Sequence, residues 1–301
     1  MWFGIFIALG PLLCGYLIKL TNKNWMKKID RSLSLLVYLI LFIMGCELAQ
    51  LNDLPNQLQT IAYSMLVLFV CSFGFNVIIL MAMDMIVPWK SGKTHQSLSS
   101  NFKLVLESLT ICFALIIGFI CGLIPLSLWQ YNALFSKIVL IILLFLVGIQ
   151  LRGNNISIKQ ILLNKIGLTT SILVIISSLF GGFVASYLLD LPAKTAMAMS
   201  SGFGWYSLSG ILMTEAHGAV IGSITFLNDI LRELCAIILL PILIKRFRLT
   251  SLGICAATSM DFTLPMLQKG GGITMVPPAI VQGFLLTLIM PILMTLLNYY
   301  F

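Results

Sequence analysis

Long apolar stretches recur along almost the whole chain and are separated by short polar segments. About 20 apolar residues are enough for an α-helix to cross a bilayer. Stretches of this kind predict spans at 1–20, 32–51, 58–87, 105–127, 136–152, 166–189, 219–245 and 274–300. The hydrophobic pattern therefore predicts eight transmembrane helices, the first of them retained because no basic region precedes it and no small-residue cleavage site follows it.

Two segments, 194–217 and 251–272, interrupt this pattern because they are rich in Gly, Ser and Thr. Irregular backbone at membrane depth is tolerated only where protein shields it or where it lines a wet cavity. We therefore predict that both segments are re-entrant hairpins. The expected fold is an all-α polytopic membrane protein with eight transmembrane helices and two re-entrant hairpins.

Composition excludes most other classes of protein. Hydrophobic residues make up 59% of the 301 residues and charged residues only 9%, whereas about a quarter of a soluble domain is charged. The net charge of +8 comes without a soluble basic face, so nucleic-acid binding is not expected. The seven cysteines show no CxxC spacing and the two histidines have no ligand-like neighbours. The sequence therefore predicts no metal site and no cofactor.

The basic residues set the expected orientation. With the N-terminus outside, fifteen of the 18 Lys and Arg residues fall on the inner side, in 19–31, 88–104, 152–165, 245–248 and at 269. An excess of Lys and Arg marks the cytoplasmic side of a membrane protein. We therefore expect a multi-pass protein of the bacterial inner membrane with both termini in the periplasm.

Internal repeats divide the chain. LFIMGCEL (41–48) resembles LFLVGIQL (144–151), and GPLLCG (10–15) resembles GFICG (118–122). These pairs match spans 1–3 with spans 4–6, and three spans per copy make the repeat inverted, as in many transporters. WYSL (205–208) and LLPILI (239–244) likewise match DFTL (261–264) and IMPILM (289–294). The pattern predicts a six-helix scaffold in 1–190 and a hairpin–helix–hairpin–helix transport region in 191–301, an arrangement similar to elevator transporters of the glutamate-transporter type.

Acidic residues within the apolar segments are the leading candidates for function, because a charge in the bilayer core costs several kcal/mol. Asp229 and Glu233 are four residues apart and share one helix face with Arg232, and Asn228 adds a polar neighbour. Carboxylates in a low-dielectric site can exchange protons near neutral pH. We expect this face to bind a proton or a cation; the alternative is a structural pair between Arg232 and one acid.

Further candidates lie outside this face. Glu47 ends the second span, where it either serves transport or is an interfacial carboxylate, and Asp261 is the acid in the core of the second hairpin. Trp205 and Tyr206 could cover an ammonium group by cation–π contact, although small residues in such a hairpin also suit tight helix packing. The candidate hairpin-tip residues are Ser201, Gly202, Gly204, Trp205, Tyr206 and Ser259.

The strings SGFGWYSLSGILMTEAHGAVIGS (201–223), FLNDILRELCAIILLPILIKR (226–246) and ATSMDFTLPMLQKGGG (257–272) resemble the bacterial lysine exporter family LysO. The resemblance extends over nearly the whole chain. It implies export of L-lysine and of its analogue thialysine, eight spans, and periplasmic termini. It also implies two essential intramembrane acids; Glu233 matches the second, and Glu47 is the acid nearest to the first.

The predicted function is secondary export of L-lysine by proton antiport, with the lipid bilayer as surroundings. No GxxxxGK[ST] motif is present, which argues against an ATP-driven pump. The alternative is a sodium-coupled importer of a small anionic or neutral solute. An enzyme is not expected, because no triad or metal cluster is apparent. The sequence leaves the coupling ion and the oligomeric state open, a homo-oligomer included.

Overall fold

The computed structural model describes residues 10–11, 13–20, 22–50, 54–86, 89, 113–124, 132–153, 164–260 and 263–299. Within these ranges the regular elements are helices, without a strand, which confirms the all-α class. Four helices there are long and apolar enough to cross a membrane: Asn24–Cys46, Gln57–Ile86, Lys165–Leu189 and Val276–Asn298. The total number of spans stays a prediction.

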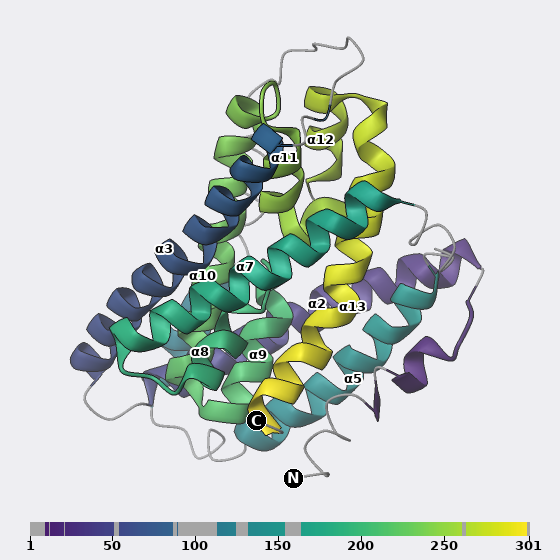
Figure 1. Cartoon of the computed structure of the whole chain (residues 1–301). Coiled ribbons are helices and arrows are strands. Elements are labelled where there is room, and N and C mark those ends of the chain that lie inside the picture. The colour runs from purple at the N-terminus through teal and green to yellow at the C-terminus, as the bar shows by residue number, and fades with distance from the viewer. Residues whose placement is uncertain are drawn as a thin grey trace.

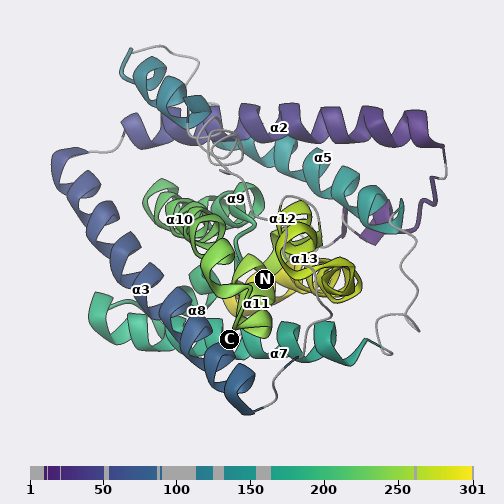
Figure 2. The same ribbon diagram turned by 90° about the horizontal axis from the view of Figure 1, so that it is seen from above.

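Helices α2 (Lys23–Ala49) and α5 (Asn132–Gly153) pack against each other along one side of the molecule (Figure 2). Two glycines of the predicted repeat lie at close helix crossings beside them. A Cβ atom on Gly15 would stand 3.1 Å from the backbone nitrogen of Ile149, and one on Gly122 would stand 2.7 Å from the Cα of Cys46. Cys46 and Ile149 occupy matching positions in the strings 41–48 and 144–151, while the inverted repeat itself stays a prediction.

Helix α2 begins earlier than the apolar pattern predicts. Residues 19–31 were expected to form a loop before a span at 32–51, whereas the helix starts at Lys23. The segment 23–31 contains neither Gly nor Pro, and the ammonium group of Lys28 lies 4.9 Å from the ring centre of Trp25, one helical turn away. The helix therefore begins within the charged segment that precedes the apolar stretch. Hydropathy alone does not reveal this boundary.

Helices α3 (Leu54–Ile86) and α7 (Lys165–Leu189) cross on the opposite side of the molecule (Figure 2). Asn76 joins them, because its amide nitrogen donates to the Ser178 hydroxyl at 2.9 Å and its oxygen accepts from the Ser177 hydroxyl at 2.9 Å. A buried side-chain amide is stable only when its polar atoms are paired in this way. This crossing gives the central helices a rigid support.

In the last third of the chain, two short helices separated by a break are followed by a long helix, and this arrangement occurs twice. We call each set of two short helices a broken pair. Helices α8 (Ala193–Ser200) and α9 (Tyr206–His217) precede α10 (Ala219–Leu243). Helix α11 (Arg248–Cys255), the 3-10 turn η2 (Ala256–Met260) and helix α12 (Leu264–Gly271) precede the 3-10 turn η3 (Ile273–Met275) and helix α13 (Val276–Tyr299). The α8–α9 and α11–α12 pairs lie at opposite ends of the molecule (Figure 1). Their re-entrance into a membrane stays a prediction.

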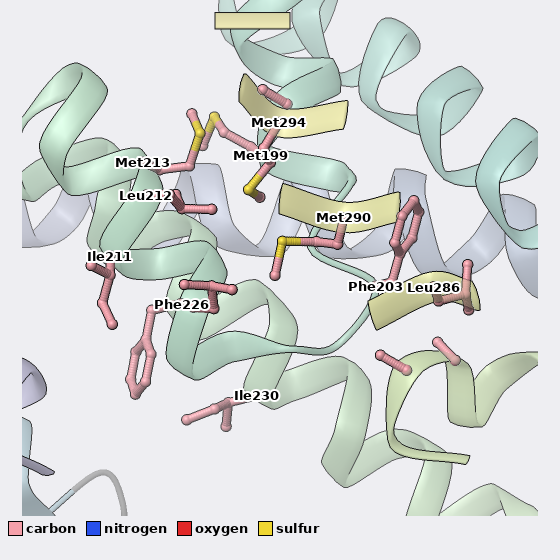
Figure 3. Packing of buried hydrophobic residues seen from close by; sticks show 14 of the residues in the cluster. Met199, Phe203, Ile211, Leu212, Met213, Phe226, Ile230, Leu286, Met290 and Met294 are labelled. Carbon is pink, nitrogen blue, oxygen red and sulfur yellow. The ribbon is translucent and has the colours of Figure 1, made fainter. Parts of the chain in front are cut away.

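Methionine side chains fill the contact between the first broken pair and α13 (Figure 3). Met199 of α8, Met213 of α9, and Met290 and Met294 of α13 are all fully buried, with Phe203 beside them. Methionine is unbranched and flexible, so it packs into irregular gaps that a branched side chain leaves open. The segment that separates α8 from α9 thus packs against closely packed apolar side chains.

Asp84 fixes the second broken pair to α3. Its carboxylate accepts hydrogen bonds from the backbone N–H groups of Leu249 and Thr250 at 3.0 and 2.8 Å, and from the Thr250 hydroxyl at 2.7 Å. These are first-turn groups of α11, which have no partner within their own helix. The neighbouring Arg248 donates to the carbonyl of Gly271 at the end of α12 and stacks on Trp89. Asp84 therefore caps α11 from another helix.

The replacement Asp84→Ala is expected to destabilise the protein by about 2 kcal/mol, because it removes a charged cap and leaves buried donors unpaired. Asp84→Asn keeps a side-chain oxygen that accepts and should cost less. Thermal unfolding of the detergent-purified variants measures both effects. An apparent Tm of Asp84→Ala equal to that of the unchanged protein would contradict the capping role.

Candidate functional site

Three charged side chains lie on the buried face of α10. Asp229, Arg232 and Glu233 are 0%, 2% and 3% exposed. Their spacing of three and four residues places them on one helix face. Charged residues are almost never buried to this degree unless they are paired or functional. The two acids that the sequence indicated, Asp229 and Glu233, therefore lie inside the protein rather than at its lipid-facing surface.

The carboxylate of Asp229 is held by the break between α8 and α9. It accepts a hydrogen bond from the Ser209 hydroxyl at 2.6 Å, one from the backbone N–H of Gly204 at 3.2 Å, and one from the Asn228 amide at 3.2 Å. Gly202 lies against the same group, because a Cβ atom there would overlap the carboxylate oxygen. Charge-assisted hydrogen bonds of this kind fix the position of a carboxylate strongly.

Arg232 points toward the same break. Its Nη1 donates to the carbonyl of Ser200, the last residue of α8, at a long 3.4 Å, and its charge interacts with that of Asp229. The Nε atom is buried and has no hydrogen-bond partner. A guanidinium group has five N–H donors, so this one retains capacity for another acceptor.

The two broken pairs meet beside these charges. The backbone N–H of Ala257 in η2 donates to the carbonyl of Phe203 at 3.1 Å. Phe203 and Ala256 have φ values of +51° and +44°, and Gly204 has +79°. Residues other than glycine rarely adopt this left-handed region, and such strain concentrates at functional sites. The contact joins η2 to the break between α8 and α9, which also holds the Asp229 carboxylate of α10.

The predicted site residues fall into three groups. Asn228, Asp229, Arg232, Gly202 and Gly204 come together at one point. Ser201, Ser259, Trp205 and Tyr206 form a second group, whose contacts stabilise the local structure. Asp261 lies outside the described residues, and although Glu47 belongs to α2, its side chain lies outside them too.

The remaining hairpin-tip candidates stabilise the local structure. Ser201 donates to the carbonyl of Ala198 at 2.8 Å, and Ser259 donates to the carbonyl of Ala279 in α13 at 2.9 Å. Trp205 and Tyr206 are half-buried. The ring of Tyr206 stands edge-on to Phe226 with 6.0 Å between ring centres. These contacts neither require nor exclude an approach of these rings to a cation.

The sequence analysis missed several groups that surround the acids. Ser209 contacts Asp229, and Ser72 of α3 donates to the Asn228 oxygen at 3.4 Å. Both are single serines within apolar helices, and many such serines in this chain merely bond to the carbonyl one turn earlier, as Ser251 does. Only the three-dimensional structure distinguishes the serines that contact Asp229 or Asn228 from those that bond to a carbonyl of their own helix.

The site has an uneven balance of charge. Its buried charged side chains on α10 are two acids, Asp229 and Glu233, and one arginine, Arg232. Charges in a low-dielectric interior interact strongly and are costly when unbalanced. No group of three metal-binding side chains occurs among the described residues.

An all-helical chain with several membrane-length helices and a buried charged site beside two helix breaks is a polytopic membrane protein. The sequence model of the family "Lysine exporter LysO" matches residues 112–298. The Lysine exporter LysO of Escherichia coli strain K12 is 50% identical over 297 residues, covering 97% of this chain and 98% of the relative. The chain belongs to this exporter family, which confirms the resemblance seen in its motifs.

A second relative is the putative lysine exporter of Haemophilus influenzae. It is 43% identical over 181 residues, which cover 60% of this chain and 93% of the relative. No solved structure matches the chain significantly. The family therefore rests on sequence similarity, and the geometry of the site comes from the structure described above.

Proposed function

We propose that this protein exports L-lysine, and its analogue thialysine, across the bacterial inner membrane in exchange for protons. Asp229 and Glu233 bind the ammonium groups of the substrate or the proton in turn, with Asp261 and Glu47 assisting. Both termini face the periplasm in this proposal. The names of the two relatives support lysine as the substrate.

The charge of the α10 face is the observation that supports exchange best. The face carries two acids, both of them buried, against one arginine. Lysine at neutral pH carries two ammonium groups and one carboxylate, for a net charge of +1. A lysine molecule or a proton therefore restores neutrality equally well, and an empty site is disfavoured because it leaves a buried charge. Such a site exchanges lysine for a proton and does not release either one alone.

Proton exchange also satisfies the energetics of export. Moving one positive charge out against an inside-negative potential costs about 2.3 kcal/mol per 100 mV. A proton that moves inward recovers this electrical work and adds the energy of the pH gradient. A sodium ion could do the same electrically, so the choice of coupling ion is tested below.

The two helix breaks supply movable parts next to the site. The contact between Phe203 and Ala257 joins the breaks, and Gly204 places its N–H on Asp229. Broken helices that meet near the centre of a membrane protein often bind substrates and coupling ions. We infer that displacement of one broken pair opens the site to one side, as in an elevator-like mechanism.

Glu233→Gln is expected to abolish lysine export, because the site then has no charge deficit for lysine to fill. Cells that lack other lysine exporters and carry this variant should become as sensitive to thialysine as cells without the protein. The control is Glu215→Gln, the same chemical change near the end of α9, which should preserve resistance.

Membrane abundance of both variants is measured by immunoblotting. Full resistance in cells with Glu233→Gln would contradict the assignment. Lysine uptake by everted vesicles that requires a sodium gradient and ignores a pH gradient would replace the proton with sodium as the coupling ion.

A further inference from the structure

Arg232 has more hydrogen-bonding capacity than its surroundings use. The side chain is 2% exposed, yet its Nε has no partner and its Nη1 makes one long bond to Ser200. An unpaired buried donor is costly, and more so when the group is charged. The oxygens of Asp229 accept from Ser209, Gly204 and Asn228. The guanidinium therefore balances the charge of Asp229 while its Nε–H stays available for another acceptor.

The charges of the site match lysine group by group. The α10 face contributes two carboxylates and one guanidinium, whereas lysine contributes two ammonium groups and one carboxylate. Guanidinium groups bind carboxylates through paired N–H donors in a fixed fork. We propose that Arg232 binds the α-carboxylate of the transported amino acid while the acids of α10 bind its ammonium groups. This assignment rests on the proposed function and specifies how that site recognises an amino acid.

This role makes Arg232 a determinant of specificity. A diamine or an amide of lysine brings two positive charges and no carboxylate, so it would leave the buried guanidinium unpaired and repelled. Free amino acids with a cationic side chain satisfy all three groups at once. The protein should therefore distinguish lysine from lysinamide, which has nearly the same shape but a neutral amide in place of the carboxylate.

The first test needs no mutation. Everted membrane vesicles that contain the unchanged protein take up labelled lysine, with unlabelled lysine or lysinamide as competitor. We expect lysinamide to compete about 10- to 100-fold more weakly, the factor that corresponds to loss of a charge-assisted hydrogen bond. Equal competition by the two compounds would overturn the assignment. Absence of lysine uptake would contradict the proposed function itself, and this assignment with it.

The second test uses Arg232→Gln, with Arg246→Gln as the matched control on an exposed position after α10. Arg232→Gln should lower lysine uptake at least about tenfold and remove the preference over lysinamide, because the two acids alone complement two ammonium groups. Arg246→Gln should retain both uptake and preference. An Arg232→Gln variant that reaches the membrane and keeps the preference for lysine would show a purely structural arginine and overturn the proposal.

Discussion

Asp229→Asn is expected to abolish lysine export, because it removes the charge that Arg232 balances and the charge deficit that a cation fills. The variant should also lose about 3–5 kcal/mol of stability, the usual cost when one partner of a buried charge pair is removed. Transport into everted vesicles and thermal unfolding of the purified protein measure the two effects separately. Asp190→Asn is the control, since Asp190 is exposed at the end of α7 and its left-handed backbone accepts asparagine.

A double variant separates function from structure at this position. Asp229→Asn combined with Arg232→Gln removes both members of the Asp229–Arg232 pair, so the guanidinium no longer lacks its partner and part of the lost stability should return. Lysine export should not return, because one ammonium site and the carboxylate site are both missing. Restored export in the double variant would mean that Asp229 and Arg232 form a structural pair only, the alternative that the sequence had left open.

Gly202→Ala is expected to reduce export at least about tenfold and to destabilise the protein by about 1–3 kcal/mol, the typical effect of overpacking. The added methyl group would overlap a carboxylate oxygen of Asp229 and would stand 2.8 Å from the Cβ of Ser209. The Asp229 carboxylate would have to move away from Gly204 and would lose its hydrogen bonds. Vesicle uptake and thermal unfolding test this result.

Gly74→Ala is the matched control, because a Cβ atom at Gly74 of α3 has no neighbour within 4 Å. Alanine is also the better helix former there, so export should be unchanged and stability equal or higher. If Gly202→Ala behaved like Gly74→Ala, the close contact between the helix break and Asp229 would have no role in transport.

The sequence predicted the all-α class of fold and placed three charged residues on one face of α10, and physical reasons explain both, while the role of this face in transport stays a prediction. Apolar length and composition report membrane helices directly, and acids buried in such helices are rare enough to stand out. The order of broken pairs and long helices in the last third also agrees with the Gly- and Ser-rich segments. The glycine contacts at Gly15 and Gly122 agree with the repeat that includes both.

Other features depend on contacts between distant segments, which local patterns do not contain. Asp84 lies near the end of the predicted span 58–87, yet it caps α11 through the backbone N–H of Leu249, 165 residues further along the chain. Ser209 and Ser72 resemble ordinary helix serines until the fold brings them to Asp229 and Asn228. The unpaired Nε–H of Arg232 is likewise visible only once its neighbours are known.

The central claim is that one buried site holds either lysine or a proton. The most direct test reconstitutes the purified protein in liposomes with lysine and a trapped pH-sensitive dye inside. Lysine leaving down its gradient should acidify the interior at a fixed ratio, and the signal should vanish in Asp229→Asn and Glu233→Gln. Lysine efflux without any proton movement, or equal efflux from both variants, would contradict the account.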